Sequence, residues 1–145
     1  MKLSTRTRYG LRLMYHLALR YNQGPIQLSE IAETEDVSEK YLGQIVIHLR
    51  AAKLIQSHRG AQGGYFLAKP PARITVYEIV QALEGDISIV GCTENPDSCE
   101  RSGECAATEV WKVLSDAIRK TLEGISLEDM LQMGRAKGSL LDFSI

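Results

Sequence analysis

The sequence predicts a mainly α-helical protein with one small β-hairpin, on the strength of three observations. Apolar residues recur at helical spacing in several segments, two short β-prone stretches flank a glycine-rich turn, and a loop with three cysteines has no periodicity. With 145 residues, 44% of them hydrophobic, the chain can bury one ordinary core and carry a helical appendage.

The first helix is expected over residues 4–22, where Gly24-Pro25 supplies the stop. Its apolar face comprises Tyr9, Leu13, Met14, Leu17, Ala18 and Tyr21. Its polar face carries Arg6, Arg8, Arg12 and Arg20. Arg6 and Arg8 are candidates for contacts with phosphate groups, and the alternative is that these arginines are simply solvated.

A helix-turn-helix is expected next, with a short helix over 28–35, a turn over 34–37 and a third helix over 39–52. Ser38 is a favourable N-cap for the third helix. The inward stripe of that helix comprises Leu42, Ile45, Val46, Leu49 and Ala52. Polar groups near its N-terminus can reach base edges and phosphates, and they are Ser38, Lys40, Tyr41 and Gln44.

Residues 54–59 and 65–68 are expected to form two short strands joined by Gly60-Ala61-Gln62-Gly63-Gly64. Glycines allow positive backbone dihedrals and let amides such as that of Gly60 approach a phosphate closely. Arg59 is placed to enter a narrow minor groove, and Arg50 is a further candidate for DNA contact. A hairpin directly after a helix-turn-helix predicts a winged helix-turn-helix domain.

The charge distribution supports binding to a polyanion. Residues 1–73 contain 11 lysines and arginines against 5 acids, a net of +6, whereas the remainder has 6 against 13, a net of −7. A basic half is typical of a protein that contacts the phosphate backbone of double-stranded DNA, and an acidic half should point away from it. The alternative is a chance distribution of surface charge.

Pro70-Pro71 ends the wing, and Thr75 to Glu78 has the spacing of a capping box for a fourth helix that ends at Gly85. Residues 107–123 form a long amphipathic helix, expected to be a dimerisation seam rather than to pack within the chain. A short helix begins near Ser126. The expected organisation is a DNA-binding domain over 1–84, a cysteine loop over 85–106, dimerisation and short C-terminal helices over 107–133, and a tail over 134–145.

Cys92, Cys99 and Cys105 lie in one polar loop, and the chain has no other cysteine. The spacing C-x6-C-x5-C is too wide for paired zinc knuckles and suits a loop that wraps a 2Fe-2S cluster. Three thiolates leave a fourth position, for which Thr108, Glu104 and Glu109 are the candidates. A free redox thiol switch, zinc and no function are the alternatives, and the acidic neighbours should raise the pKa of the thiols.

Other classes of protein are disfavoured. The chain has no apolar run long enough to span a bilayer and no signal peptide, so a cytoplasmic protein without membrane contact is expected. No nucleophile and base pair, phosphate loop or catalytic carboxylate pair is recognisable, so an enzyme is not expected. A cluster carrier or electron-transfer protein, docking its basic half on an acidic protein, is the more distant alternative.

Together these segments resemble the iron-sulfur cluster regulators (IscR) of the Rrf family of bacterial winged helix-turn-helix repressors, over nearly the whole chain to about Leu131. The segments that carry the resemblance are residues 1–10, 28–33, 38–42, 59–65 and the cysteine loop. The resemblance implies a homodimeric repressor of cluster-assembly genes that holds a 2Fe-2S cluster through Cys92, Cys99 and Cys105. It also implies a palindromic DNA site, with Gln44 in the major groove and Arg59 in the minor groove.

Three features depart from that pattern. Relatives place a histidine ligand where this chain has Thr108, and they often carry an acid where it has Gly43. The short C-terminal tail is more similar to that of CymR-like repressors of cysteine metabolism, which generally lack the cysteine loop. A regulator of the same fold that senses nitric oxide, a thiol or cysteine status is therefore the alternative function.

Overall fold

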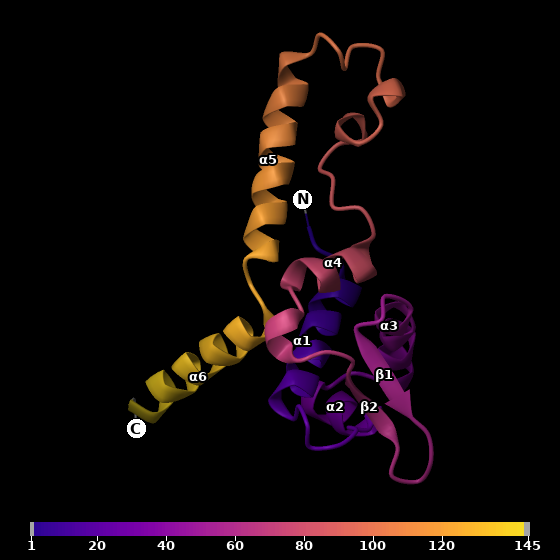
Figure 1. The fold of residues 1–145 in the computed structure, drawn as a ribbon, viewed down its shortest axis with the longest axis vertical. Coiled ribbons are helices and arrows are strands. Elements are labelled where there is room, and N and C mark those ends of the chain that lie inside the picture. Colours follow the sequence, from indigo (N-terminus) through magenta and orange to yellow (C-terminus); the bar gives the residue numbers. More distant parts are fainter. Residues whose placement is uncertain (1, 144–145) are drawn as a thin grey trace.

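The computed structural model describes residues 2–143, and side chains as far as residue 138. It confirms the predicted fold class, because a helical body carries a two-stranded antiparallel wing (Figure 1). The body contains α1 (Thr5–Leu19), α2 (Leu28–Glu35), α3 (Glu39–Ala51), β1 (Ile55–His58), β2 (Gly64–Leu67), η1 (Pro71–Arg73) and α4 (Val76–Glu84). Beyond it come η2 (Gly91–Thr93), η3 (Pro96–Ser98), α5 (Ala106–Glu123) and α6 (Leu127–Phe143).

The predicted caps are present. The hydroxyl of Ser38 accepts a hydrogen bond from the Tyr41 amide at 3.0 Å and so begins α3. Thr75 and Glu78 form the complete capping box of α4. Partial burial opposes ionisation of Glu78, but the Thr75 amide and the nearby Lys69 ammonium outweigh it and hold the pKa of Glu78 below its ordinary value.

The core lies where α1, α3 and α4 meet. Leu13 and Met14 of α1, Ile45 of α3 and Ile79 of α4 have no exposed surface. Gly10 lets α1 approach closely, because a methyl group there would collide with the Leu83 side chain. Ala52 was expected to face inward but is exposed. The reason is that α3 ends at Ala51, so Ala52 is the C-cap and no longer follows the helical stripe.

A buried carboxylate joins the first two helices. The Glu35 side chain is 10% exposed, and its two oxygens lie 2.5 Å from Arg12 Nη2 and 2.7 Å from His16 Nε2. Arg20, the C-cap residue of α1, pairs with Glu30 of α2. Two of the four arginines expected on the polar face of the first helix therefore pair with acids of α2, and both remain partly exposed.

The wing is fixed by backbone contacts. Ile55 pairs with Leu67 and His58 with Gly64 in register. Tyr65 exchanges two backbone hydrogen bonds with Ile26, at 2.8 and 2.9 Å, which tie the wing to the segment before α2. Gly64 has a φ of +157°, and a side chain there would collide with the Ile26 carbonyl. The wing glycines are therefore required by the local geometry.

The last two helices extend away from the body (Figure 1). Leu127 and Leu131 are buried in the core, which anchors the start of α6. The sequence indicated a short helix and then a tail over 134–145, whereas the structure continues α6 to Phe143. Gly134 does not end the helix because it packs directly on Tyr15 of α1, and good helix formers follow it.

Candidate functional site

The exposed polar face of α3 is the candidate for reading DNA. Lys40 and Gln44 are exposed, as expected for groups that reach a groove. Tyr41 is half-buried, and its ring packs edge-on against Tyr9 with ring centres 5.9 Å apart, so part of its surface serves packing rather than DNA contact. A Cβ at Gly43 would meet nothing within 4 Å, which shows open space beside this face.

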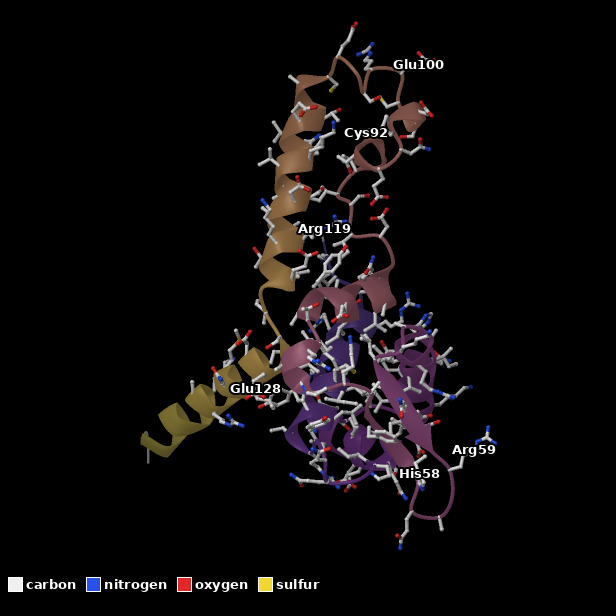
Figure 2. The ribbon with its side chains drawn as sticks, viewed as in Figure 1. His58, Arg59, Cys92, Glu100, Arg119 and Glu128 are labelled. Atoms are coloured by element: carbon white, nitrogen blue, oxygen red, sulfur yellow. The ribbon has the colours of Figure 1, made fainter. Side chains whose placement is uncertain are left out.

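The wing and the end of α3 carry further basic groups. Arg59 projects outward from the wing beside Gly60, which has a φ of +118° (Figure 2). Arg50 lines a shallow groove of about 480 Å³ with Lys53, Gln56 and Ser57. The sequence interpretation missed Lys53, although a cation three residues after Arg50 is a usable signal for a phosphate contact.

The two arginines of the N-terminal turn of α1 have different surroundings. Arg8 is exposed. Arg6 donates hydrogen bonds to the Leu83 carbonyl from Nε at 3.0 Å and from Nη2 at 2.7 Å, and its Nη1 lies 3.4 Å from His48 Nε2. Arg6 therefore caps the end of α4 and links it to α3, so the structure assigns it a structural contact in addition to the expected one with DNA.

The cysteine loop runs beside the upper part of α5, with Cys92 facing the helix and Glu100 at the outer tip (Figure 2). Cys92 Sγ lies 3.9 Å from Thr108 Oγ1, and Thr108 is 2% exposed. Cys99 is exposed. Within residues 2–143, no group of three histidine, cysteine, aspartate or glutamate side chains is arranged to hold a metal ion. The loop thus brings Cys92 to Thr108 but does not preassemble the three sulfurs.

Thr108 also contacts Cys105, which is the N-cap residue of α5. The sulfur makes no regular capping hydrogen bond, but the Thr108 hydroxyl, followed by the amides of Thr108 and Ala107, lowers the pKa of the Cys105 thiol. The acidic neighbours had indicated the opposite direction. The pKa is lowered rather than raised because N–H and O–H dipoles at the start of the helix contact the sulfur directly, whereas the acids are solvated.

The other two candidate fourth ligands face solvent. Glu104 is exposed, and the Glu109 side chain is 70% exposed with Oε1 3.2 Å from Lys112 Nζ. The structure therefore places Thr108 against the sulfurs of Cys92 and Cys105, and both acids in solvent.

A stripe of apolar side chains on α5 is exposed. Val110 is 58% exposed, Leu114 36% and Trp111 37%, as expected for a helix that pairs outside its own chain. Val113, at 70%, adds to this surface and was missed, because it lies beside the strict helical stripe.

Residues 3–133 match the family model Rrf2, described as an iron-dependent transcriptional regulator. The chain belongs to the Rrf2 family. Its relatives are transcriptional regulators and not enzymes. None of the helices within the described part of the chain is long and apolar enough to cross a membrane.

Two kinds of relative stand out. The HTH-type transcriptional regulator CymR of Bacillus subtilis is 42% identical, over 90% of this chain and 89% of that protein. The regulator IscR of Photorhabdus laumondii is 34% identical, over 90% of this chain and 79% of that protein.

Solved structures show the same two kinds. CymR, titled the global cysteine regulator of B. subtilis, has a TM-score of 0.78 and 41% identity over 92% of this chain and 98% of that one. T. potens IscR has a TM-score of 0.75 and 36% identity over 92% and 88%.

Proposed function

We propose that the protein is a homodimeric repressor that reads palindromic DNA with α3 and the wing and senses a 2Fe-2S cluster on the cysteine loop. The observation that carries the proposal is the pairing of two cysteines with one buried residue at the start of α5. Cys92 and Cys105 both approach Thr108, which lies on the helix that presents the exposed apolar stripe. A change at the cysteines is thereby connected to the proposed dimer interface.

The dimer is supported by the exposed Val110, Val113 and Leu114 of α5, which a second copy of the helix would cover. Two recognition helices related by a two-fold axis read half-sites about 34 Å apart, one turn of DNA. In each subunit, Gln44 would contact the major groove and Arg59 the minor groove, with Lys40, Arg50 and Arg8 at phosphates.

The three cysteines and Thr108 supply ligand types that fit a 2Fe-2S cluster. Three thiols on a loop without regular structure can close around an iron-sulfur core, and the lowered pKa of Cys105 favours the thiolate that binds iron. Thr108 is the best-placed residue for the fourth position, because its oxygen already faces Cys92. A bound cluster would supply a redox-sensitive centre, and the thiolates of Cys92, Cys99 and Cys105 that would hold it would order the 92–105 loop beside α5.

A second candidate is a repressor of cysteine-metabolism genes whose signal is a thiol or a protein. The likeness to CymR favours it, since identity with that regulator is higher than with the IscR proteins compared above. Thiol sensing also uses a low-pKa cysteine, and Cys105 meets that requirement.

The two candidates are separated by measuring visible absorption and iron content of anaerobically isolated protein, alongside Cys92→Ala. We expect a coloured, iron-containing wild type and a colourless variant. A wild type that stays colourless after anaerobic reconstitution would reject cluster sensing and favour the second candidate.

DNA binding is tested on a palindromic duplex by fluorescence anisotropy across salt concentrations. We expect a steep log-log slope, and Arg59→Ala should reduce its magnitude by about 1 while weakening binding. Arg135→Ala, on exposed α6, is the matched control and should change neither quantity. Binding that is insensitive to salt would contradict the proposed interface.

A further inference from the structure

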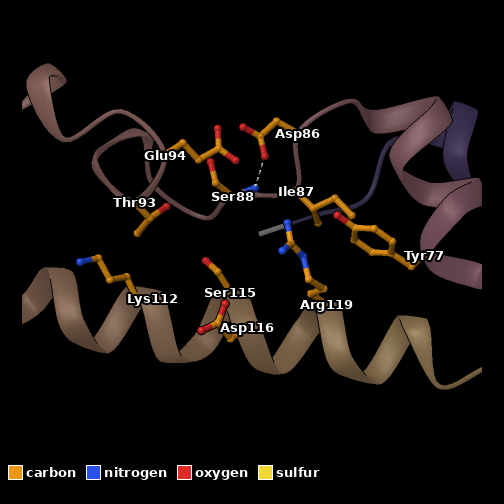
Figure 3. Close-up of a pocket in the computed structure, with 10 residues that line it drawn as sticks. All are labelled: Tyr77, Asp86, Ile87, Ser88, Thr93, Glu94, Lys112, Ser115, Asp116 and Arg119. Carbon is orange, nitrogen blue, oxygen red and sulfur yellow. Dashed lines mark hydrogen bonds between the residues drawn. The ribbon is translucent and has the colours of Figure 1, made fainter.

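A cavity of about 340 Å³ lies between α5, α4 and the chain that leads from α4 to the cysteine loop (Figure 3). Its volume is near the lower end of the range for small-molecule sites, about 300–1,000 Å³. We propose that this cavity binds a small zwitterion of the α-amino acid class. The site is separate from the three cysteines and from the DNA-reading surface, and it goes beyond the function proposed above.

One wall of the cavity provides donors for a carboxylate. Arg119 lies 5.5 Å from the ring centre of Tyr77, a cation–π contact that holds the guanidinium toward the cavity. Ser115, one helical turn before it, has a buried hydroxyl without a hydrogen-bond partner within the described residues. A guanidinium fork beside an unsatisfied hydroxyl is suited to a carboxylate, because both donate to its oxygens.

The facing wall provides acceptors for an ammonium group. Asp86 and Glu94 lie across the cavity from Ser115 and Arg119 (Figure 3). One oxygen of Asp86 accepts from the Ser88 amide at 3.1 Å, which fixes the position of that carboxylate. Neither acid forms an ion pair within the described residues, so both remain available to a cation.

The separation of charge across the cavity selects the ligand class. The lining holds three carboxylates and two cationic side chains, so a dianion would meet net repulsion. A diamine would place one ammonium against Arg119. An α-amino acid offers a partner of the right charge to each wall, its carboxylate for Arg119 and Ser115 and its ammonium for Asp86 and Glu94.

Most of the apolar stripe of α5 faces away from the site. Ser115 and Arg119 are four residues apart and share the face of α5 that looks toward the cysteine loop. Val110, Leu114 and Ala117 lie on the side of the helix opposite Ser115 and Arg119, whereas Trp111 of the same stripe precedes Ser115 by one turn. Because Glu94 is two residues after Cys92, a ligand that bridges it to α5 would also hold the loop against the helix.

The test is isothermal titration calorimetry of the full-length protein with each proteinogenic L-amino acid. Cysteine and histidine, which bind iron themselves, are titrated into Cys92→Ala. We expect at least one amino acid to bind. Its amine analogue without the carboxylate and its hydroxy-acid analogue without the ammonium should each bind about tenfold more weakly, the cost of losing one charged hydrogen-bonding partner.

Variants locate the site. Arg119→Gln and Asp86→Asn should each weaken binding about tenfold, while Arg135→Gln should leave it unchanged. Far-UV circular dichroism of each variant checks that it folds, and the analogue comparison stands independently if one does not. Binding of no amino acid, or equal binding of the analogues that lack one charge, overturns the proposal.

Discussion

The packing of α6 on α1 predicts opposite effects for two glycines of the same helix. A methyl group on Gly134 would overlap Tyr15 Oη and approach Tyr15 Cζ to 2.9 Å. A methyl group on Gly138 would meet nothing within 4 Å. Gly134→Ala and Gly138→Ala are therefore a matched pair, in which helix propensity changes equally and packing changes at one site alone.

The expected magnitudes follow from these contacts. Replacing glycine by alanine inside a helix stabilises by about 1 kcal/mol. Overpacking a contact that cannot relax costs about 1–3 kcal/mol. Gly138→Ala should thus raise the free energy of unfolding by up to about 1 kcal/mol, whereas Gly134→Ala should leave it unchanged or lower it by as much as about 2 kcal/mol.

Urea denaturation at one protein concentration measures both variants, with an unchanged slope as the check that the unfolded states are comparable. A difference of about 1–3 kcal/mol between the variants is expected. Equal stabilisation by both substitutions would refute the reasoning, because it would mean that α6 does not rest on Tyr15.

Three further predictions concern charged groups and thiols. Glu35→Gln should lower the free energy of unfolding by about 1–3 kcal/mol in urea denaturation, because it weakens both contacts of a buried carboxylate with α1. The Ser4 hydroxyl, then the hydroxyl of Thr7 and the amide of Ser4, lower the pKa of Glu84 below its ordinary value. The contribution of Glu84 to the free energy of unfolding should therefore be present above about pH 4.5 and be lost as the pH falls through the folded-state pKa. In apo protein, Thr108→Val should raise the pH midpoint of Cys105 alkylation, measured by mass spectrometry, because it removes the hydroxyl that lowers that pKa.

Each of these has a discriminating control. Glu30→Gln removes a solvent-exposed ion pair with Arg20 and should cost less than about 1 kcal/mol. If it costs as much as Glu35→Gln, burial is not the cause. Glu84→Gln should reduce the loss of unfolding free energy as the pH falls below about 4.5. A loss identical to that of the wild type would contradict the lowered pKa of Glu84. An unchanged alkylation midpoint in Thr108→Val would show that the helix amides alone set the Cys105 pKa.

The helix caps and the wing could be predicted from the sequence. Ser38 and the Thr75 and Glu78 pair mark helix starts because their side chains bond to backbone amides a few residues away. The wing was likewise recognisable from Arg59 to Gly64, although the close contact of Gly64 with the Ile26 carbonyl was not. Interactions within about four residues are encoded in the order of residue types, and for that reason they could be predicted.

Contacts between distant segments were decided by the tertiary structure. The sequence alone determined the fold class, the basic half and the presence of three thiols in one loop, since these depend on composition and short spacing. The folded chain decided that Arg6 caps α4, that α6 passes Gly134 without ending, that Thr108 lowers the pKa of Cys105, and that Arg119 faces Asp86 across a cavity. Each of these depends on how separate elements pack, and packing distances between such elements are not written in local sequence patterns.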